Sequence, residues 1–439
     1  MWRLGELAPP RPRPATLPDA FSAAGYDTAL VGKMHLGGDR QFVGFDDRPY
    51  GDLTGMAGHQ DDPPMSYWER GWKGNPKGWE GNPGHPRPRV TGIPESLLQE
   101  RVVLEESLAW LRRRAHDSTD PWLLTASFSR PHGPLTAPER HLDAHPPDEV
   151  PMPETWPSPL DHPAAPEAGD RESMLERRGA YLACVEFLDE VLGDLLAALD
   201  REGFLDDTIV VYTSDHGDMA GEHGAPGKCK PFEDSVRVPL HVQTPAHRRN
   251  EAANRVETPV SLIDLFPTLC GLAGVEAPDG LDGVDLSSAV RTGAEPERGP
   301  VVSDYLTPSF GFPEFRVVRD GDYKLVCYRD HPDLLFDLAA DPEETENLVP
   351  DATGADAEAL DRLRAFVDRT LDFGVAEAIR RRDEELLPEH ALPTGTRGLH
   401  NAYHRPDGRV VEADTPLYAP HVIAEDAERI YPDYDGKRN

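Results

Sequence analysis

The sequence predicts an α/β protein with a large mixed, mostly parallel sheet flanked by helices, and a smaller C-terminal α+β subdomain containing an antiparallel sheet. Three apolar runs, at 28–31, 122–128 and 209–212, are too short for helices and indicate buried strands. Amphipathic segments of helical length are expected to cover the sheet. Beyond residue 300, two strand-like runs flank an Asp-Gly-Asp turn, which indicates a hairpin. A chain of 439 residues can bury a large core.

The helices follow from apolar spacing and from glycines at their ends. A helix over 17–24 stops at Gly25, and the longest helix, over 171–202, stops at Gly203 and leads into the strand at 209–212. The remaining predicted elements are helices at 95–114, 261–273 and 357–371, strands at 239–242, 315–319 and 323–328, and irregular stretches at 55–92 and 137–170.

We place a large first domain at 1–295, an α+β subdomain at 296–375 and a C-terminal extension at 376–439. The stretch 291–300 is the predicted linker, and the tail from 388 carries no recognisable motif.

Polar side chains follow each of the three predicted strands. Lys33 and His35 come after the first, His132 after the second, and Asp215 and His216 after the third. Ligands of open α/β sheets bind beyond the carboxyl ends of parallel strands, so strands that share one sheet would bring these residues to a common crevice. Cations grouped around a metal-binding carboxylate suit an anionic ester substrate. For one strand alone, a turn with a solvated Asp explains the pattern equally well.

Other candidate ligands are interpreted as structural. Asp46 and Asp47 lack a preceding buried strand, which favours a turn. His141, His145 and His162 lie in a Pro-rich stretch without evident partners, so we expect them to be solvated.

Composition excludes some classes of partner. The 79 acidic residues against 45 basic ones give a formal net charge of −34, which argues against nucleic acid and against an anionic membrane surface. Lysine occurs seven times, yet two of the seven, Lys33 and Lys228, fall at the candidate site.

The four scattered cysteines indicate buried thiols and no disulfide framework. No signal peptide or membrane-spanning run is found, so a cytoplasmic location is expected unless the natural start lies upstream.

Ordered motifs extend along most of the chain. They are Leu17-Pro18-Asp19, Gly32-Lys33-Met34-His35-Leu36-Gly37, Pro131-His132-Gly133-Pro134, Ser214-Asp215-His216-Gly217-Asp218-Met219, Gly221-Glu222-His223-Gly224, Gly227-Lys228, Glu233-Asp234-Ser235-Val236-Arg237-Val238-Pro239, Ile263-Asp264-Leu265-Phe266-Pro267-Thr268, Leu281-Asp282-Gly283 and Phe336-Asp337-Leu338. In this order they resemble the sulfatases of the alkaline phosphatase superfamily. The resemblance implies an alkaline phosphatase-like fold and a sulfuric ester hydrolase.

The resemblance also implies roles for the site residues. Asp215 and His216 would bind a divalent cation, usually calcium, with Mg²⁺ or Mn²⁺ possible, although the family often has Asn where His216 stands. Lys33 and His35 would contact a formylglycine nucleophile. His132 and Lys228 would bind the sulfate and help to protonate the leaving oxygen. The implied partner is a small-molecule or carbohydrate sulfate ester; its identity and the oligomeric state stay open.

The nucleophile of that mechanism is not found in the sequence. No Ser or Cys has Pro at +2 and Arg at +4; Cys229 comes nearest but has Glu233 at the last position. The family's opening strand, with two further metal-binding aspartates, is not found either, so the chain resembles a sulfatase lacking its amino-terminal part. Three hypotheses stay open: a sulfatase whose start is set too late, a non-catalytic remnant, and a phosphodiester or phosphonate monoester hydrolase of the same superfamily.

Overall fold

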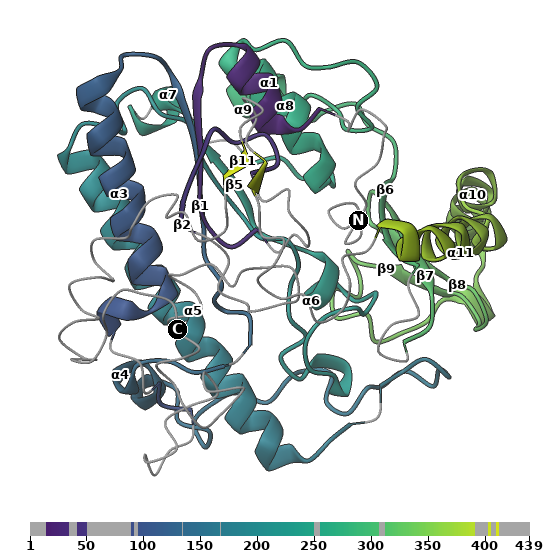
Figure 1. The fold of residues 1–439 in the computed structure, drawn as a ribbon. Coiled ribbons are helices and arrows are strands. Elements are labelled where there is room, and N and C mark those ends of the chain that lie inside the picture. The colour runs from purple at the N-terminus through teal and green to yellow at the C-terminus, as the bar shows by residue number, and fades with distance from the viewer. Residues whose placement is uncertain are drawn as a thin grey trace.

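The computed structural model describes residues 15–34, 42–50, 89–91, 95–133, 135–166, 168–249, 255–306, 312–390, 403–404 and 410–411. In these residues a parallel sheet with its helices lies on one side of the molecule, and an antiparallel sheet covered by helices lies on the other (Figure 1). The predicted boundaries at 295/296 and 375/376 stay predictions. No helix in the described ranges is long and apolar enough to cross a membrane.

The parallel sheet has the strand order β2-β1-β3, with β1 at Asp27–Gly32, β2 at Asp47–Tyr50 and β3 at Trp122–Ser127. The central strand β1 and the edge strand β3, both predicted, pair in parallel, from Asp27 opposite Trp122 to Gly32 opposite Ser127. The middle of β1 is fully buried, as its apolar run predicts. Two helices pack next to β1: α1 (Leu17–Ala23) and α3 (Gln99–Asp117).

The turn before β2 has the structural role that the sequence predicts. Thr28 Oγ1 donates to a carboxylate oxygen of Asp46 at 2.8 Å, and the Asp46 N–H donates back to Thr28 Oγ1 at 2.9 Å. Ser22 of α1 also donates to Asp46, at 3.1 Å. Asp46 therefore joins α1, β1 and the entry to β2.

The third predicted strand is not hydrogen-bonded into this parallel sheet. It forms β4 (Val210–Thr213), which pairs antiparallel with β5 (Leu240–Gln243) in a separate two-stranded sheet. The expectation that all three strands share one parallel sheet is therefore wrong for β4 in the described part of the chain. The strands still share a core, because Leu124 of β3 and Val210 of β4 pack against one cluster formed by α3 and α5 (Arg171–Arg201). The expectation of full burial is also wrong for these two strands: the residues of β3 are only partly buried, and in β4 Tyr212 is 40% exposed.

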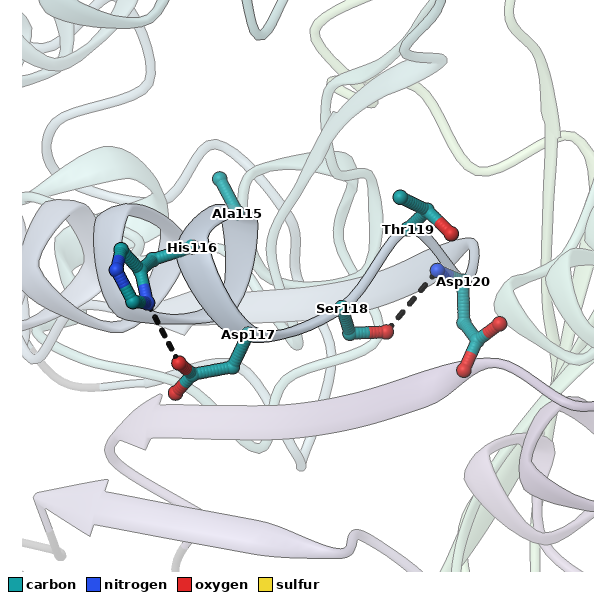
Figure 2. A pocket seen from close by; sticks show the side chains of 6 residues that line it. All are labelled: Ala115, His116, Asp117, Ser118, Thr119 and Asp120. Carbon is teal, nitrogen blue, oxygen red and sulfur yellow. Dashed lines mark hydrogen bonds and ion pairs between the residues drawn. The ribbon is translucent and has the colours of Figure 1, made fainter.

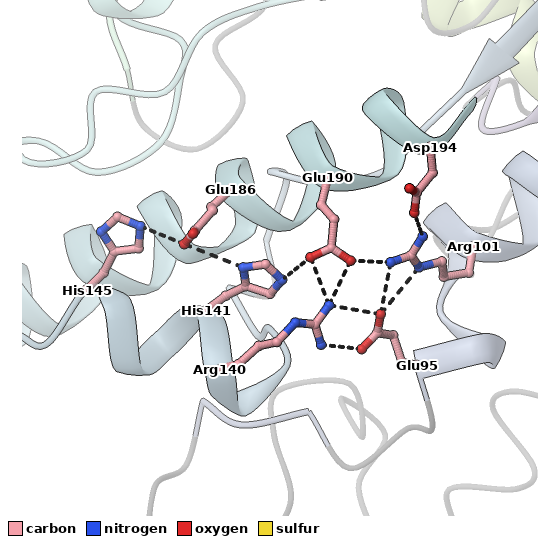
Figure 3. Close-up of polar contacts among 8 residues, drawn as sticks. All are labelled: Glu95, Arg101, Arg140, His141, His145, Glu186, Glu190 and Asp194. Carbon is pink, nitrogen blue, oxygen red and sulfur yellow. Dashed lines mark hydrogen bonds and ion pairs between the residues drawn. The ribbon is translucent and has the colours of Figure 1, made fainter. Parts of the chain in front are cut away.

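A polar network fastens α5 to the helices beside it (Figure 3). Arg101 of α3 pairs with Glu190 of α5 and with Glu95 of the short helix η1 (Glu95–Leu97). Arg140 of α4 (Glu139–Ala144) pairs with the same two glutamates. His141 of α4 is only 5% exposed and lies 3.2 Å from Glu190. The expectation of a solvated His141 is therefore wrong.

His162 and His145, which were also expected to be solvated, differ in their burial. His162 is also buried: it stacks on Tyr328, with ring centroids 5.1 Å apart, and its Nε2 lies 2.9 Å from the Pro332 carbonyl oxygen. His145 is half-exposed and pairs with Glu186 of α5 at 3.1 Å (Figure 3).

The C-terminal subdomain is a four-stranded antiparallel sheet in the order β6-β7-β8-β9. Its strands are β6 (Val301–Tyr305), β7 (Phe315–Asp320), β8 (Tyr323–Tyr328) and β9 (Leu334–Asp337), and β7 and β8 form the predicted hairpin. One face packs on α10 (Gly354–Thr370). The other contributes Phe315 and Phe336 to a core that contains Met219 and Phe232, so the sheet and the segment after β4 share buried apolar surface.

A buried ionic group crosses the same boundary. Lys324 of β8 is fully buried and pairs with Glu233 at 2.8 Å and with Glu344 at 2.7 Å. Glu233 begins α6 (Glu233–Val236), directly after the Lys228 loop. The remaining elements are α7 (Pro245–Arg248), α8 (Leu265–Ala273), α9 (Ser287–Thr292), α11 (Phe373–His390), β10 (Tyr403–His404), β11 (Val410–Val411) and the short helices η2 (Glu222–Gly224), η3 (Leu262–Asp264) and η5 (Val349–Asp351).

Candidate active site

The candidate residues follow the carboxyl ends of β1, β3 and β4. Lys33 comes directly after β1, and its backbone N–H donates to Ser127 O, at the end of β3, at 3.1 Å. His132 lies in the loop after β3, while Asp215 and His216 follow β4. His35 lies outside the described residues.

The predicted residues after β3 and β4 meet, although β4 belongs to a separate sheet. Lys228 Nζ lies 2.8 Å from His216 Nε2, and the His132 and His216 rings have centroids 6.3 Å apart. His216 Nδ1 lies 2.8 Å from Gly217 O, a carbonyl that can only accept, so Nδ1 carries a proton. His216 Nε2 then accepts a hydrogen bond from the Lys228 ammonium. The carboxylate of Asp215 is 3.6 Å from His216 Nε2 and is largely exposed.

Lys33 belongs to the same group by its charge. Burial lowers the pKa of His132 to about 4, and the charges of Lys33 and Lys228 add to this effect. Burial, followed by the charge of Lys33, also lowers the pKa of Lys228. A partial loss of solvation acts to raise the pKa of Asp215, but the positive charges around it bring that pKa below the ordinary value. The group therefore holds two ammonium charges and one exposed carboxylate, with His132 neutral at pH 7.

The His132 loop is positioned by two residues at the start of α3 that sequence reasoning missed. The N–H of Ser129 donates to Gln99 at 2.8 Å, and the N–H of Arg130 donates to Glu100 at 3.1 Å. The Arg130 guanidinium pairs with the same Glu100, whose side chain is fully buried. A signal was present in the sequence, because Gln99-Glu100 is a polar pair at the start of an apolar helix face.

The segment that carries Lys228 is held by close backbone contacts. The N–H of Gly217 donates to Ser235 O at 2.9 Å, and a Cβ at position 217 would lie 1.9 Å from Asp234 O, so only glycine fits there. Asp218 accepts from the N–H of Gly227 at 3.1 Å, which closes the loop immediately before Lys228.

The described residues do not by themselves form a site for the family's divalent cation. No three His, Cys, Asp or Glu side chains in the described ranges are grouped to hold a metal ion. Calcium takes six to eight oxygen ligands, whereas Asp215 and His216 offer one carboxylate and one nitrogen. In addition, the Lys228 ammonium is already bonded to the His216 nitrogen that would face a metal. We therefore derive no reaction step from a metal ion.

A shallow pocket elsewhere lies away from this cluster. It is lined by residues 115–120 between α3 and β3, and Figure 2 shows His116 and Asp117 paired at its rim, 2.8 Å apart. It precedes the amino end of β3, whereas His132 follows the carboxyl end. Its location therefore separates it from the candidate site.

The family is established by comparison with known proteins. The family model "Sulfatase" matches residues 3–275, and the model "N-sulphoglucosamine sulphohydrolase, C-terminal" matches residues 221–365. A choline-sulfatase of Rhizobium meliloti is 32% identical over 79% of this chain and 69% of its own length. An arylsulfatase of Clostridium perfringens is 29% identical over 76% of this chain and 73% of its own length. The chain therefore belongs to the sulfatase family of the alkaline phosphatase superfamily.

A solved structure supports the fold class. The phosphonate monoester hydrolase of Agrobacterium radiobacter superimposes with a TM-score of 0.65 over 94% of this chain and 86% of its own, at 24% sequence identity. The predicted alkaline phosphatase-like α/β fold, with a parallel sheet, flanking helices and a C-terminal antiparallel sheet, is confirmed.

Proposed function

We propose that this sulfatase-family hydrolase acts on sulfate esters of small molecules or carbohydrates, and that the sulfate binds among Lys33, His132 and Lys228. The observation that carries the proposal is the 2.8 Å contact between Lys228 Nζ and His216 Nε2, which brings a lysine to the end of β4. Lys33 follows β1 at the same end of the sheet, where its backbone N–H donates to Ser127 O at the end of β3. Two ammonium groups and an imidazole suit a tetrahedral oxyanion with several oxygens.

Each residue has a proposed role in cleavage of the sulfur–oxygen ester bond. Lys33 and Lys228 would offset the negative charge of the sulfate oxygens. The departing alcohol oxygen needs a proton, and the Lys228 ammonium can donate one. His132 is neutral at pH 7 in the free protein, so it can act as a donor only after the negative charge of a bound sulfate favours its protonation. The family's formylglycine motif does not occur in the 439 residues, so we assign the attacking group to no residue of this sequence.

Turnover of an aryl sulfate tests the proposal. In a preparation with measurable hydrolysis, Lys228→Ala or His132→Ala should each lower kcat/KM by roughly 10²-fold, because each removes a charge clamp or a proton donor. His116→Ala is the matched control, because His116 is exposed and lies before the amino end of β3, whereas His132 follows its carboxyl end. Rates near wild type for both site variants would refute the assignment.

Hydrolysis of phosphonate monoesters or phosphodiesters is the second candidate function. A cationic group of this kind binds tetrahedral phosphorus oxyanions by the same interactions, and a protein of similar fold is a phosphonate monoester hydrolase. Parallel assays of an aryl sulfate and an aryl phosphonate monoester separate the two candidates. A chain that binds both oxyanions and cleaves neither would support the non-catalytic hypothesis.

A further inference from the structure

Lys230 is a buried lysine for which the described part of the chain provides no acidic partner. Its side chain follows Lys228 by two residues, is only 7% exposed and places Nζ 3.1 Å from the centre of the Phe312 ring. Its other polar contact is a long one, 3.5 Å to Lys228 O. Among the described residues, no carboxylate lies within ion-pair distance of it.

Lys324 provides an internal comparison. It is buried to a similar degree, but two carboxylates within 3 Å balance its charge. Removing an ammonium from water without such a partner is unfavourable. Accordingly, burial lowers the pKa of Lys230 to about 8. A cation–π contact with Phe312 returns part of the lost solvation, although it leaves the charge without a counter-ion.

The position of Lys230 relates it to the sulfate site. Its ammonium touches the backbone of Lys228, the residue that contacts His216. Phe312 precedes β7, so the pair joins the Lys228 segment to the C-terminal subdomain. Lys230 and the Phe312 ring therefore lie between the Lys228 segment and the C-terminal subdomain, next to the proposed sulfate site.

We propose that Lys230 and Phe312 form a second subsite, which binds a carboxylate or a further sulfate carried by the leaving group of the substrate. The inference rests on the proposed sulfate site at Lys33, His132 and Lys228. The ammonium would pair with the anion, and the ring would contact the adjacent apolar part of the leaving group. The same charge disfavours a cationic leaving group, such as the quaternary ammonium of choline.

Calorimetric titration with non-hydrolysable sulfonates tests this subsite. Benzenesulfonate carries one anion, the meta and para sulfobenzoates carry a second, and a trimethylammonium alkanesulfonate carries a cation instead. Wild-type protein should bind at least one sulfobenzoate roughly tenfold or more tightly than benzenesulfonate, and the cationic probe more weakly than either, as a charge-assisted contact at Lys230 implies.

Two substitutions locate the effect. Lys230→Met should bring the ratio of the sulfobenzoate and benzenesulfonate dissociation constants close to one, whereas Lys230→Arg should keep most of the preference. His116→Ala should keep all of it, and thermal unfolding shows which variants are folded. If Lys230→Met does not fold, the probe preferences of the wild type and of Lys230→Arg still test the subsite.

The outcomes separate the subsite from the function on which it rests. Equal affinity of wild-type protein for the mono- and dianionic probes, or an unchanged preference in Lys230→Met, would overturn the inference while leaving the sulfate site intact. Failure of every sulfonate to bind wild-type protein would overturn the proposed function, and the subsite with it.

Discussion

Replacing Lys324 by Met should destabilise the protein strongly. The Lys324 ammonium is fully buried, 2.8 Å from a Glu233 oxygen and 2.7 Å from a Glu344 oxygen. The two glutamates stay adjacent without it, because the N–H of Glu233 donates to the Glu344 carboxylate at 2.6 Å. Removing the cation therefore leaves two neighbouring, mostly buried carboxylates. We expect a loss of about 3–5 kcal/mol in the free energy of unfolding near pH 7, the usual cost of breaking a buried ion pair.

The pH dependence of this loss follows from the two glutamates. In the wild type, burial alone would raise the pKa of Glu233, but Lys324 and Arg319 bring it below the ordinary 4.5. The stabilisation from this carboxylate is present above pH 4.5 and is lost as the pH falls through the lower folded-state pKa. Burial raises the pKa of Glu344 even beside Lys324, so removal of the cation should raise it further. In the variant, the penalty should therefore shrink as the pH falls toward 4.5 and the carboxyls become neutral.

Urea unfolding of wild type and Lys324→Met at pH 7.5 and pH 5 measures both effects, with equal m-values required for the comparison. Arg362→Met is the control, because its pair with Asp320 is exposed and should contribute no more than about 1 kcal/mol. A loss below about 1 kcal/mol at pH 7.5, or a loss that grows on acidification, would refute the reasoning.

Three further predictions concern the site. Gly217→Ala should cost about 2 kcal/mol or more of stability and weaken benzenesulfonate binding, because the new methyl group would meet Asp234 O; unchanged unfolding and binding would contradict this. Glu100→Gln should weaken binding severalfold by loosening the His132 loop, and it should also lower the free energy of unfolding, because Arg130 loses its buried carboxylate partner; equal affinity would show that the loop needs no such support. The preference of wild-type protein for sulfobenzoate over benzenesulfonate should fall as the pH rises through about 8, because Lys230 loses its charge there. A constant ratio of the two dissociation constants up to pH 9.5 would contradict the role of Lys230 in the second subsite.

Much of the fold could be predicted because the relevant signals are local. The apolar run before Gly32 and the stripe along residues 171–202 each lie within one segment, and both became the predicted element. The meeting of His132, His216 and Lys228 could also be predicted, because strand ends and family motifs mark these positions.

The rest depends on partners far along the chain. His141 is buried because Glu186 and Glu190, more than forty residues later, face it from α5. The pairing of β4 with β5 likewise depends on which strand edges come together in the fold, and an apolar run in the sequence carries no information about that. The cation–π contact of Lys230 requires Phe312, over eighty residues away and in the other subdomain, so its sequence neighbours gave no signal.

The central claim is that Lys228 and His132 bind the sulfate, and calorimetric titration of the 439-residue chain with benzenesulfonate tests it most directly. Wild-type protein should bind benzenesulfonate saturably, Lys228→Ala and His132→Ala should bind it roughly tenfold or more weakly, and His116→Ala should bind it as the wild type does. Unchanged affinity in both site variants, or no binding to a folded wild-type chain, would contradict it.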